Sequence, residues 1–126
     1  MPHALIIDDN RNNIDVLTML LEQEGVSQTA VQNGKQVTKA LDQIEKVDVV
    51  FLDLEFPYGD GFQVLEVVKA IPEFADVPVI AYTVHTSEID EVRRAGFDGF
   101  LGKPLDSRRF SGQLKRILNG IPVWDA

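Results

Sequence analysis

Residues 49–57 constrain the fold more than any other stretch of this chain. Four apolar residues, Val-Val-Phe-Leu, run directly into Asp53, and Pro57 closes the segment. A short, continuous apolar run is typical of a strand buried on both faces, as in a parallel sheet. A carboxylate buried at the end of such a strand costs free energy unless the protein uses it. Because ligands of open α/β sheets bind beyond the carboxyl ends of the strands, we expect Asp53 to lie at a functional site.

The bulk composition indicates one ordinary globular domain. A length of 126 residues suits a single unit, so residues 1–126 are predicted to form one domain. The chain has no cysteine, which excludes a disulfide framework and a thiolate zinc site. No apolar run is long enough to span a membrane, and the first residues lack the basic region of a signal peptide. We therefore expect a cytoplasmic protein with no membrane partner.

The charge is unevenly distributed along the chain. Residues 1–90 carry five Lys/Arg against sixteen Asp/Glu, a net charge of −11, whereas residues 91–126 carry seven against four, a net charge of +3. The acidic part disfavours direct binding of nucleic acid, since that affinity comes mainly from neutralising phosphates. The basic last third either faces an acidic partner protein or consists of solvated helix faces.

Apolar strands and amphipathic helices alternate five times. The strands are expected at residues 3–7, 26–31, 48–52, 77–82 and 98–101. Asn10 suits the N-cap of the first helix, and Asp106 or Ser107 that of the last. This alternation predicts a parallel sheet with helices on both faces and right-handed crossovers. The remaining residues, 121–126, are expected to leave Trp124 exposed.

Polar residues stand at the carboxyl ends of four predicted strands. Asp8 and Asp9 follow the first strand, Asp53 the third, Thr83 the fourth and Lys103 the fifth. Because these ends meet at one edge of a parallel sheet, the three carboxylates, the hydroxyl and the ammonium are expected to converge. Each feature alone is common on protein surfaces, so the prediction depends on their order along successive strands.

Such a cluster suits phosphoryl chemistry at a metal ion. Three neighbouring carboxylates repel one another and need a counter-charge. Oxygen ligands without His or Cys favour a hard cation, Mg²⁺ or else Mn²⁺. The lysine and the hydroxyl provide what the other oxygens of a phosphoryl group require. A carboxylate can be the nucleophile and become an aspartyl-phosphate, and Asp53 is the candidate.

The pattern resembles the response-regulator receiver domains of two-component systems over nearly the whole chain. The matching residues are Ile7-Asp8-Asp9-Asn10, Asp53, Pro57, Asp60-Gly61, Thr83 and Lys103-Pro104. The resemblance implies an α/β, flavodoxin-like (βα)5 fold with strand order 2-1-3-4-5. No output domain fits after residue 120, so we expect a stand-alone, chemotaxis-type receiver, although a piece of a larger regulator stays an alternative.

The resemblance also implies roles for individual residues. Asp53 would accept a phosphoryl group from a phosphohistidine of a sensor histidine kinase or a histidine phosphotransfer protein. Asp9 would bind Mg²⁺ directly and Asp8 through water or by positioning, while Asp53 and the backbone carbonyl of Glu55 would complete the metal shell. Lys103 would pair with the phosphoryl oxygens. No turnover of small molecules is expected from such a module.

A conformational switch is implied at Thr83 and Phe100. Thr83 would move to hydrogen-bond the phosphoryl group, and Phe100 would rotate inward as it does so. The fourth helix, fifth strand and fifth helix would then present a different surface to a downstream protein or to a second copy of the chain. We hypothesise that this output surface includes the basic residues of the last third, namely Arg93, Arg94, Arg108, Arg109, Lys115 and Arg116.

Some positions depart from the family pattern, and other functions were weighed. Glu55 and Val84 are unusual beside the site and leave the lifetime of a phosphoryl group open.

The main alternative is a degenerate receiver that acts as a constitutive interaction module. A haloacid dehalogenase-type phosphatase is disfavoured because the acidic pair precedes Asp53 rather than following it. An FMN-binding flavodoxin is disfavoured because Asp8 and Asp9 would repel the phosphate.

Overall fold

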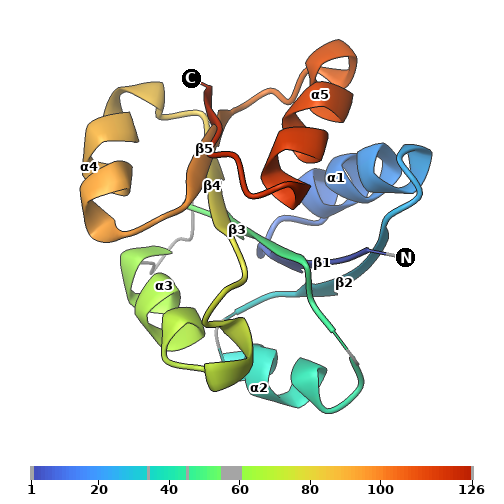
Figure 1. Ribbon diagram of the computed structural model, residues 1–126, viewed down its shortest axis with the longest axis vertical. Helices are drawn as coiled ribbons and strands as arrows, with labels where there is room; N and C mark the ends of the chain where they lie inside the picture. The colour runs from blue at the N-terminus through green and yellow to red at the C-terminus, as the bar shows by residue number, and fades with distance from the viewer. Residues whose placement is uncertain (1, 34, 45, 55–60, 126) are drawn as a thin grey trace.

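A six-stranded parallel sheet lies between two helical layers (Figure 1). The computed structural model describes residues 2–33, 35–44, 46–54 and 61–125. The strands are β1 (His3–Ile7), β2 (Ser27–Val31), β3 (Val49–Asp53), β4 (Val79–Thr83), β5 (Gly99–Gly102) and β6 (Trp124–Asp125). The helices are α1 (Arg11–Gln23), α2 (Lys35–Leu41), α3 (Gly61–Lys69), α4 (Ile89–Ala95) and α5 (Ser107–Leu118), with single 3₁₀ turns η1 (Pro72–Phe74) and η2 (Thr86–Glu88).

The sheet has the order β2-β1-β3-β4-β5-β6. This confirms the predicted flavodoxin-like arrangement 2-1-3-4-5 and adds β6, which the sequence analysis did not predict. Helices α1 and α5 cover one face of the sheet, and α2, α3 and α4 cover the other (Figure 1). Among the described helices, none combines the length and the apolarity needed to cross a membrane.

The central strand β3 is buried along its whole length, as its apolar sequence predicts. Its side chains alternate between the two faces, so Phe51 packs on the α1/α5 side while Val50 and Leu52 pack on the other. Phe51 meets Tyr82 edge-on with a centroid distance of 6.5 Å, and it lies 6.3 Å from the ring of Phe110 in α5. These aromatic contacts fix the end of β4 against β3 and α5.

Three strands end one residue later than the sequence analysis predicted. The structure places Asp53, Thr83 and Gly102 inside β3, β4 and β5 as their last residues. Strand β4 also begins later, since Pro78 has no N–H to donate and only its carbonyl joins the ladder, accepting from the N–H of Val50 at 2.9 Å. Asp53 and Thr83 were predicted to follow their strands. Because they belong to β3 and β4, the ladders of the sheet fix their positions.

The N-caps predicted for the first and last helices are confirmed, and the cap of the last helix is Asp106. The side chain of Asn10 accepts the N–H of Asn13 at 3.1 Å, and that of Asp106 accepts the N–H of Arg108 at 2.9 Å. Helix α4 ends at Gly96, whose φ of 107° is in the left-handed region that favours glycine.

His3, at the start of β1, lies against two hydroxyls of the edge strand β2. Its Nδ1 is 2.7 Å from the Oγ of Ser27 and its Nε2 is 2.8 Å from the Oγ1 of Thr29. Partial burial lowers the pKa of His3 below its ordinary value of 6.5, and the nearby charge of Asp48 only partly offsets this. The folded protein therefore holds His3 neutral at a pH where the unfolded chain takes up a proton.

This difference predicts that stability falls as the pH decreases below about 6.5. Stability from neutral His3 is complete above the pKa of the unfolded chain and is lost as the pH falls towards the lower pKa of the folded state. The slope should reach at most about 1.4 kcal/mol per pH unit. Urea midpoints of the native protein, His3→Gln and the exposed-site control His85→Gln, measured from pH 7.5 to 5.5, test this. A slope that His3→Gln leaves unchanged would contradict it.

Candidate functional site

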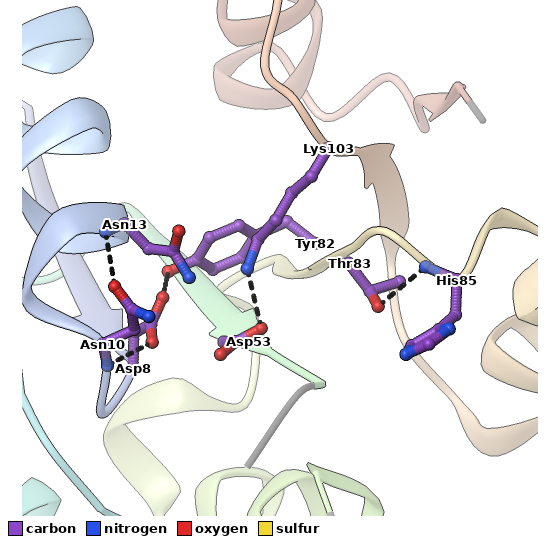
Figure 2. Close-up of polar contacts among 8 residues, drawn as sticks. All are labelled: Asp8, Asn10, Asn13, Asp53, Tyr82, Thr83, His85 and Lys103. Carbon is purple, nitrogen blue, oxygen red and sulfur yellow. Dashed lines mark hydrogen bonds and ion pairs between the residues drawn. The ribbon is translucent and has the colours of Figure 1, made fainter.

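The carboxyl ends of β1, β3, β4 and β5 bring the predicted site residues to one edge of the sheet (Figure 2). Asp8 and Asp9 follow β1, Asp53 ends β3, Thr83 ends β4 and Lys103 follows β5. The parallel ladders align Asp53 with Tyr82 and align Thr83 with Gly102. The register of the sheet therefore produces the convergence that strand order and strand ends predicted.

Three carboxylates gather closely enough to share one cation. One oxygen from each of Asp8, Asp9 and Asp53 lies within 4.8 Å of the others. Asp8 and Asp53 are 0% and 1% exposed, whereas Asp9 faces solvent. Their mutual repulsion favours a bound positive charge, and an all-oxygen donor set fits Mg²⁺ or Mn²⁺. Glu55, the predicted source of a further carbonyl ligand, lies outside the described residues.

Lys103 supplies a positive charge that partly balances the three carboxylates. Its Nζ is 3.0 Å from Oδ1 of Asp53, and the two side chains are 9% and 1% exposed. The backbone N–H of Lys103 donates to the carbonyl of Thr83 at 2.8 Å, and the Lys103–Pro104 peptide bond is cis. A buried ion pair of this kind is costly to break because the remaining charge has lost its water. The ammonium is thereby kept beside Asp53.

Tyr82 is a site residue that the sequence analysis missed. Its hydroxyl donates to Oδ2 of Asp8 at 2.5 Å, while the N–H of Asn10 donates to Oδ1 at 2.8 Å (Figure 2). The Nζ of Lys103 lies 4.6 Å from the centroid of its ring. Tyr82 therefore contacts both the acidic pair and the lysine. The sequence analysis looked only at residues that follow the predicted strands, although Tyr82, the last residue of the predicted strand 77–82, also needs a polar partner for its hydroxyl when buried.

Removing the Tyr82 hydroxyl should destabilise the metal-free protein. In Tyr82→Phe the buried Asp8 loses a donor, which costs about 1–3 kcal/mol in the free energy of unfolding. Urea denaturation measures the loss directly. In an Asp8→Asn background the same substitution should cost clearly less, because the two residues act together. Equal losses in the two backgrounds would show that the hydroxyl does not act through Asp8.

Thr83 and Phe100 occupy fixed places in this conformation. Thr83 is fully buried, and its Oγ1 accepts the N–H of His85 at 3.1 Å (Figure 2). Phe100 is also fully buried, in the cluster on the α4 side of the sheet. The ring that was expected to rotate inward therefore already lies in the core here. Val84, the unusual residue directly after Thr83, is 53% exposed.

Two further parts of the expected pattern, Pro57 and Asp60, fall outside the described residues. Gly61 is described, at the first position of α3. A Cβ on this residue would lie 2.5 Å from Cδ2 of Leu54 and 3.3 Å from its Cα. Glycine thus allows α3 to begin directly against the chain that leaves Asp53.

A solved structure with a similar fold provides the first comparison. The receiver domain of sensor histidine kinase PA1611 from Pseudomonas aeruginosa PAO1 superposes with a TM-score of 0.78 at 24% identity, over 94% of this chain and 98% of that one. That structure has a magnesium ion coordinated in its active site cleft. At this identity the likeness concerns the fold.

Sequence relatives identify the family. Protein PilH of Pseudomonas aeruginosa is 33% identical over 122 residues, which cover 95% of this chain and 100% of PilH. The transcriptional regulatory protein CpxR of Escherichia coli is 32% identical over 120 residues, so 94% of this chain spans only 50% of CpxR. The family model of the response regulator receiver domain matches residues 4–115. This chain therefore belongs to the response regulator receiver domain family.

Proposed function

We propose that residues 1–126 act as a phosphorylation-dependent receiver whose phosphoryl acceptor is Asp53. The observation that carries this proposal is the position of Asp53. Its carboxylate is buried at the end of β3, paired with Lys103 and grouped with Asp8 and Asp9. A buried nucleophile between an ammonium and a metal-binding cluster is what transfer of a phosphoryl group requires.

The donor in this proposal is a phosphohistidine of a histidine kinase or a histidine phosphotransfer protein. An oxygen of Asp53 forms a bond to phosphorus while the bond from phosphorus to the imidazole nitrogen breaks, and the electron pair of that bond returns to the imidazole. Lys103 then pairs with a phosphoryl oxygen, and Thr83 donates its hydroxyl to another. Transfer of this kind depends mostly on positioning and charge.

Asp8, Asp9 and Asp53 would hold the metal ion, with the carbonyl of Glu55 as the predicted fourth contribution from the chain. Magnesium bound there supplies positive charge that offsets the carboxylates and the phosphoryl oxygens. Tyr82 keeps Asp8 oriented, and Asp9 faces the solvent from which the ion arrives. The magnesium in the PA1611 receiver supports the choice of cation.

Receiver domains are signalling modules and do not turn over small molecules. In this chain the proposed output is a change in the surface formed by α4, β5 and α5, linked to Asp53 through Thr83 and Phe100. The surface would bind a downstream protein or a second copy of the chain, in the cytoplasm and without nucleic acid or membrane. The basic residues of α4 and α5 support a protein partner with acidic groups.

Incubation with acetyl phosphate tests the proposed function. With Mg²⁺ present, intact mass should show one added phosphoryl group that is stable in acid and labile in base, as an acyl phosphate is. EDTA should prevent the modification. If the mass stays unchanged with Mg²⁺ or Mn²⁺, the chain is a constitutive interaction module instead.

A further inference from the structure

Strand β6 lies on the face that the proposed function assigns to output. It pairs in parallel with β5, with Trp124 opposite Phe100 and Asp125 opposite Leu101. The N–H of Phe100 donates to the carbonyl of Val123 at 2.7 Å. Figure 1 shows this last stretch of chain passing between α4 and α5, beside β5. Without it, β5 would be the open edge of the sheet.

Trp124 occupies the α4 side of this face and is half-buried, so the expectation that it is exposed is wrong. It packs against the apolar cluster that contains Phe100. The Cζ of Arg93 in α4 stacks 4.5 Å from the centre of its ring. A cation over an aromatic face is an attractive contact, strongest where water is excluded.

Asp125 occupies the α5 side. Its Oδ2 accepts from Nε2 of Gln113 at 2.8 Å and lies 3.3 Å from Nη2 of Arg109 and 3.6 Å from Nη2 of Arg116. The adjacent residues Trp124 and Asp125 thus contact three arginines of the basic last third, namely Arg93, Arg109 and Arg116. The arginines are the ones that an acidic partner would be expected to contact.

Residues 123–125 approach β5 closely, but the paired strand that they form is short. A Cβ on Gly99 would lie 2.8 Å from the carbonyl oxygen of Val123 and 2.8 Å from Cδ1 of Ile80. The Ile80 contact is the end of a flexible side chain, whereas the Val123 contact is backbone, so the missing side chain lets the segment reach β5. Yet β6 has two residues, and the arginines that pair with Asp125 are 57% and 48% exposed. The apolar anchor of the segment is one side chain, Val123, which is buried in the cluster on the α1/α5 side. Exposed ion pairs and two-residue strands add little stability, so release of the segment exposes this one side chain and leaves the rest of the sheet folded.

We propose that residues 123–125 are an exchangeable occupant of this face, and that a partner protein takes their place. The partner contributes an extended segment in which an aromatic residue precedes an acidic one. It adds to β5 as a strand, places its ring under Arg93 and its carboxylate between Arg109 and Arg116. Open strand edges recruit such segments through main-chain hydrogen bonds, and side-chain pockets provide specificity.

The inference rests on the proposed function only for the role of the face in output. A cavity of about 400 Å³ extends beside the segment and is lined by Lys103, Arg109 and Asp125 among others. The docking face therefore borders the same space as Lys103, the lysine that pairs with Asp53. Binding at the face can nevertheless be measured without any phosphoryl group, so failure here and failure at Asp53 are distinguishable.

Hydrogen exchange followed residue by residue tests whether the segment leaves. The Phe100 amide, bonded to Val123, should exchange faster than the Val50 amide, which donates to Pro78 in the middle of the sheet. Gly99→Ala should accelerate exchange at Phe100 more than at Val50. The control Gly112→Ala, where an added Cβ meets nothing within 4 Å, should leave the ratio of the two rates unchanged. Equal rates at Phe100 and Val50 in both native protein and Gly99→Ala would overturn the proposal.

A labelled peptide of residues 119–126 tests the docking site in the full chain. Fluorescence anisotropy should show binding to the Trp124→Ala/Asp125→Ala protein about tenfold or more tighter than to the native protein, because the native segment competes for the face. Adding Arg93→Ala and Arg116→Ala should abolish binding, whereas Arg94→Ala and Arg108→Ala should not. Adding Gly99→Ala should also abolish it. Equal affinity for native and substituted proteins, or indifference to Arg93 and Arg116, would overturn the proposal.

Discussion

Asp53→Asn should abolish phosphoryl uptake, lowering it at least on the order of 10³-fold. The substitution preserves the size of a side chain that is buried at the end of β3 but replaces the nucleophilic carboxylate with an amide. Lys103, Asp8 and Asp9 remain, so the rest of the cluster is intact. Intact mass after incubation with acetyl phosphate and Mg²⁺ measures the effect, and circular dichroism checks that the variant folds.

A matched control separates the loss of a nucleophile from the loss of a negative charge. Asp15 lies on α1, pairs with Arg11 at 3.5 Å and has a side chain that is 63% exposed. Asp15→Asn changes the net charge equally and should leave phosphoryl uptake unchanged. Modification that persists in Asp53→Asn would place the acceptor at another residue and refute the assignment.

Asp9→Asn should have opposite effects on stability with and without the metal. In metal-free buffer it should raise the melting temperature by about 2–5 °C, or roughly 1 kcal/mol, since one of three mutually repelling charges is removed. In native protein, added Mg²⁺ should raise the melting temperature progressively with concentration, because the ion binds the folded state. In Asp9→Asn that rise should be much smaller.

Thermal unfolding over a Mg²⁺ titration checks both effects. The control is Asp76→Asn, an exposed carboxylate that precedes β4 at the opposite edge of the sheet. It should alter neither the metal-free melting temperature nor the response to Mg²⁺. A metal-free destabilisation in Asp9→Asn would mean that repulsion within the cluster is already relieved by other groups.

The main features of the site were predictable because they follow from strand order and strand ends. Asp53 and Lys103 are 50 residues apart in sequence, yet the alternation of strands and helices was enough to predict that they meet. Parallel strands with short connections leave only one edge for their carboxyl ends. Prediction of this kind needs only the regular elements and the residue type at each end.

The missed features depend on contacts that no local pattern encodes. Strand β6 is two residues long, too short for any periodicity, and its position depends on Gly99 and on arginines of two helices. Tyr82 was missed because its partner, Asp8, is 74 residues away and the donor lies inside a strand. The strand ends differed by one residue because hydrogen-bond ladders, not hydrophobicity, decide where pairing stops.

The two edges of the sheet also affect the tendency of the protein to aggregate at high concentration. A bare edge strand invites pairing with neighbouring molecules, which leads to aggregation. On one side, β2 presents polar Ser27, Gln28 and Thr29 at the rim. On the other, residues 123–125 cover β5, whose own sequence, Gly-Phe-Leu-Gly, has no charge to discourage pairing. By covering β5, this short strand also protects the colloidal stability of the chain.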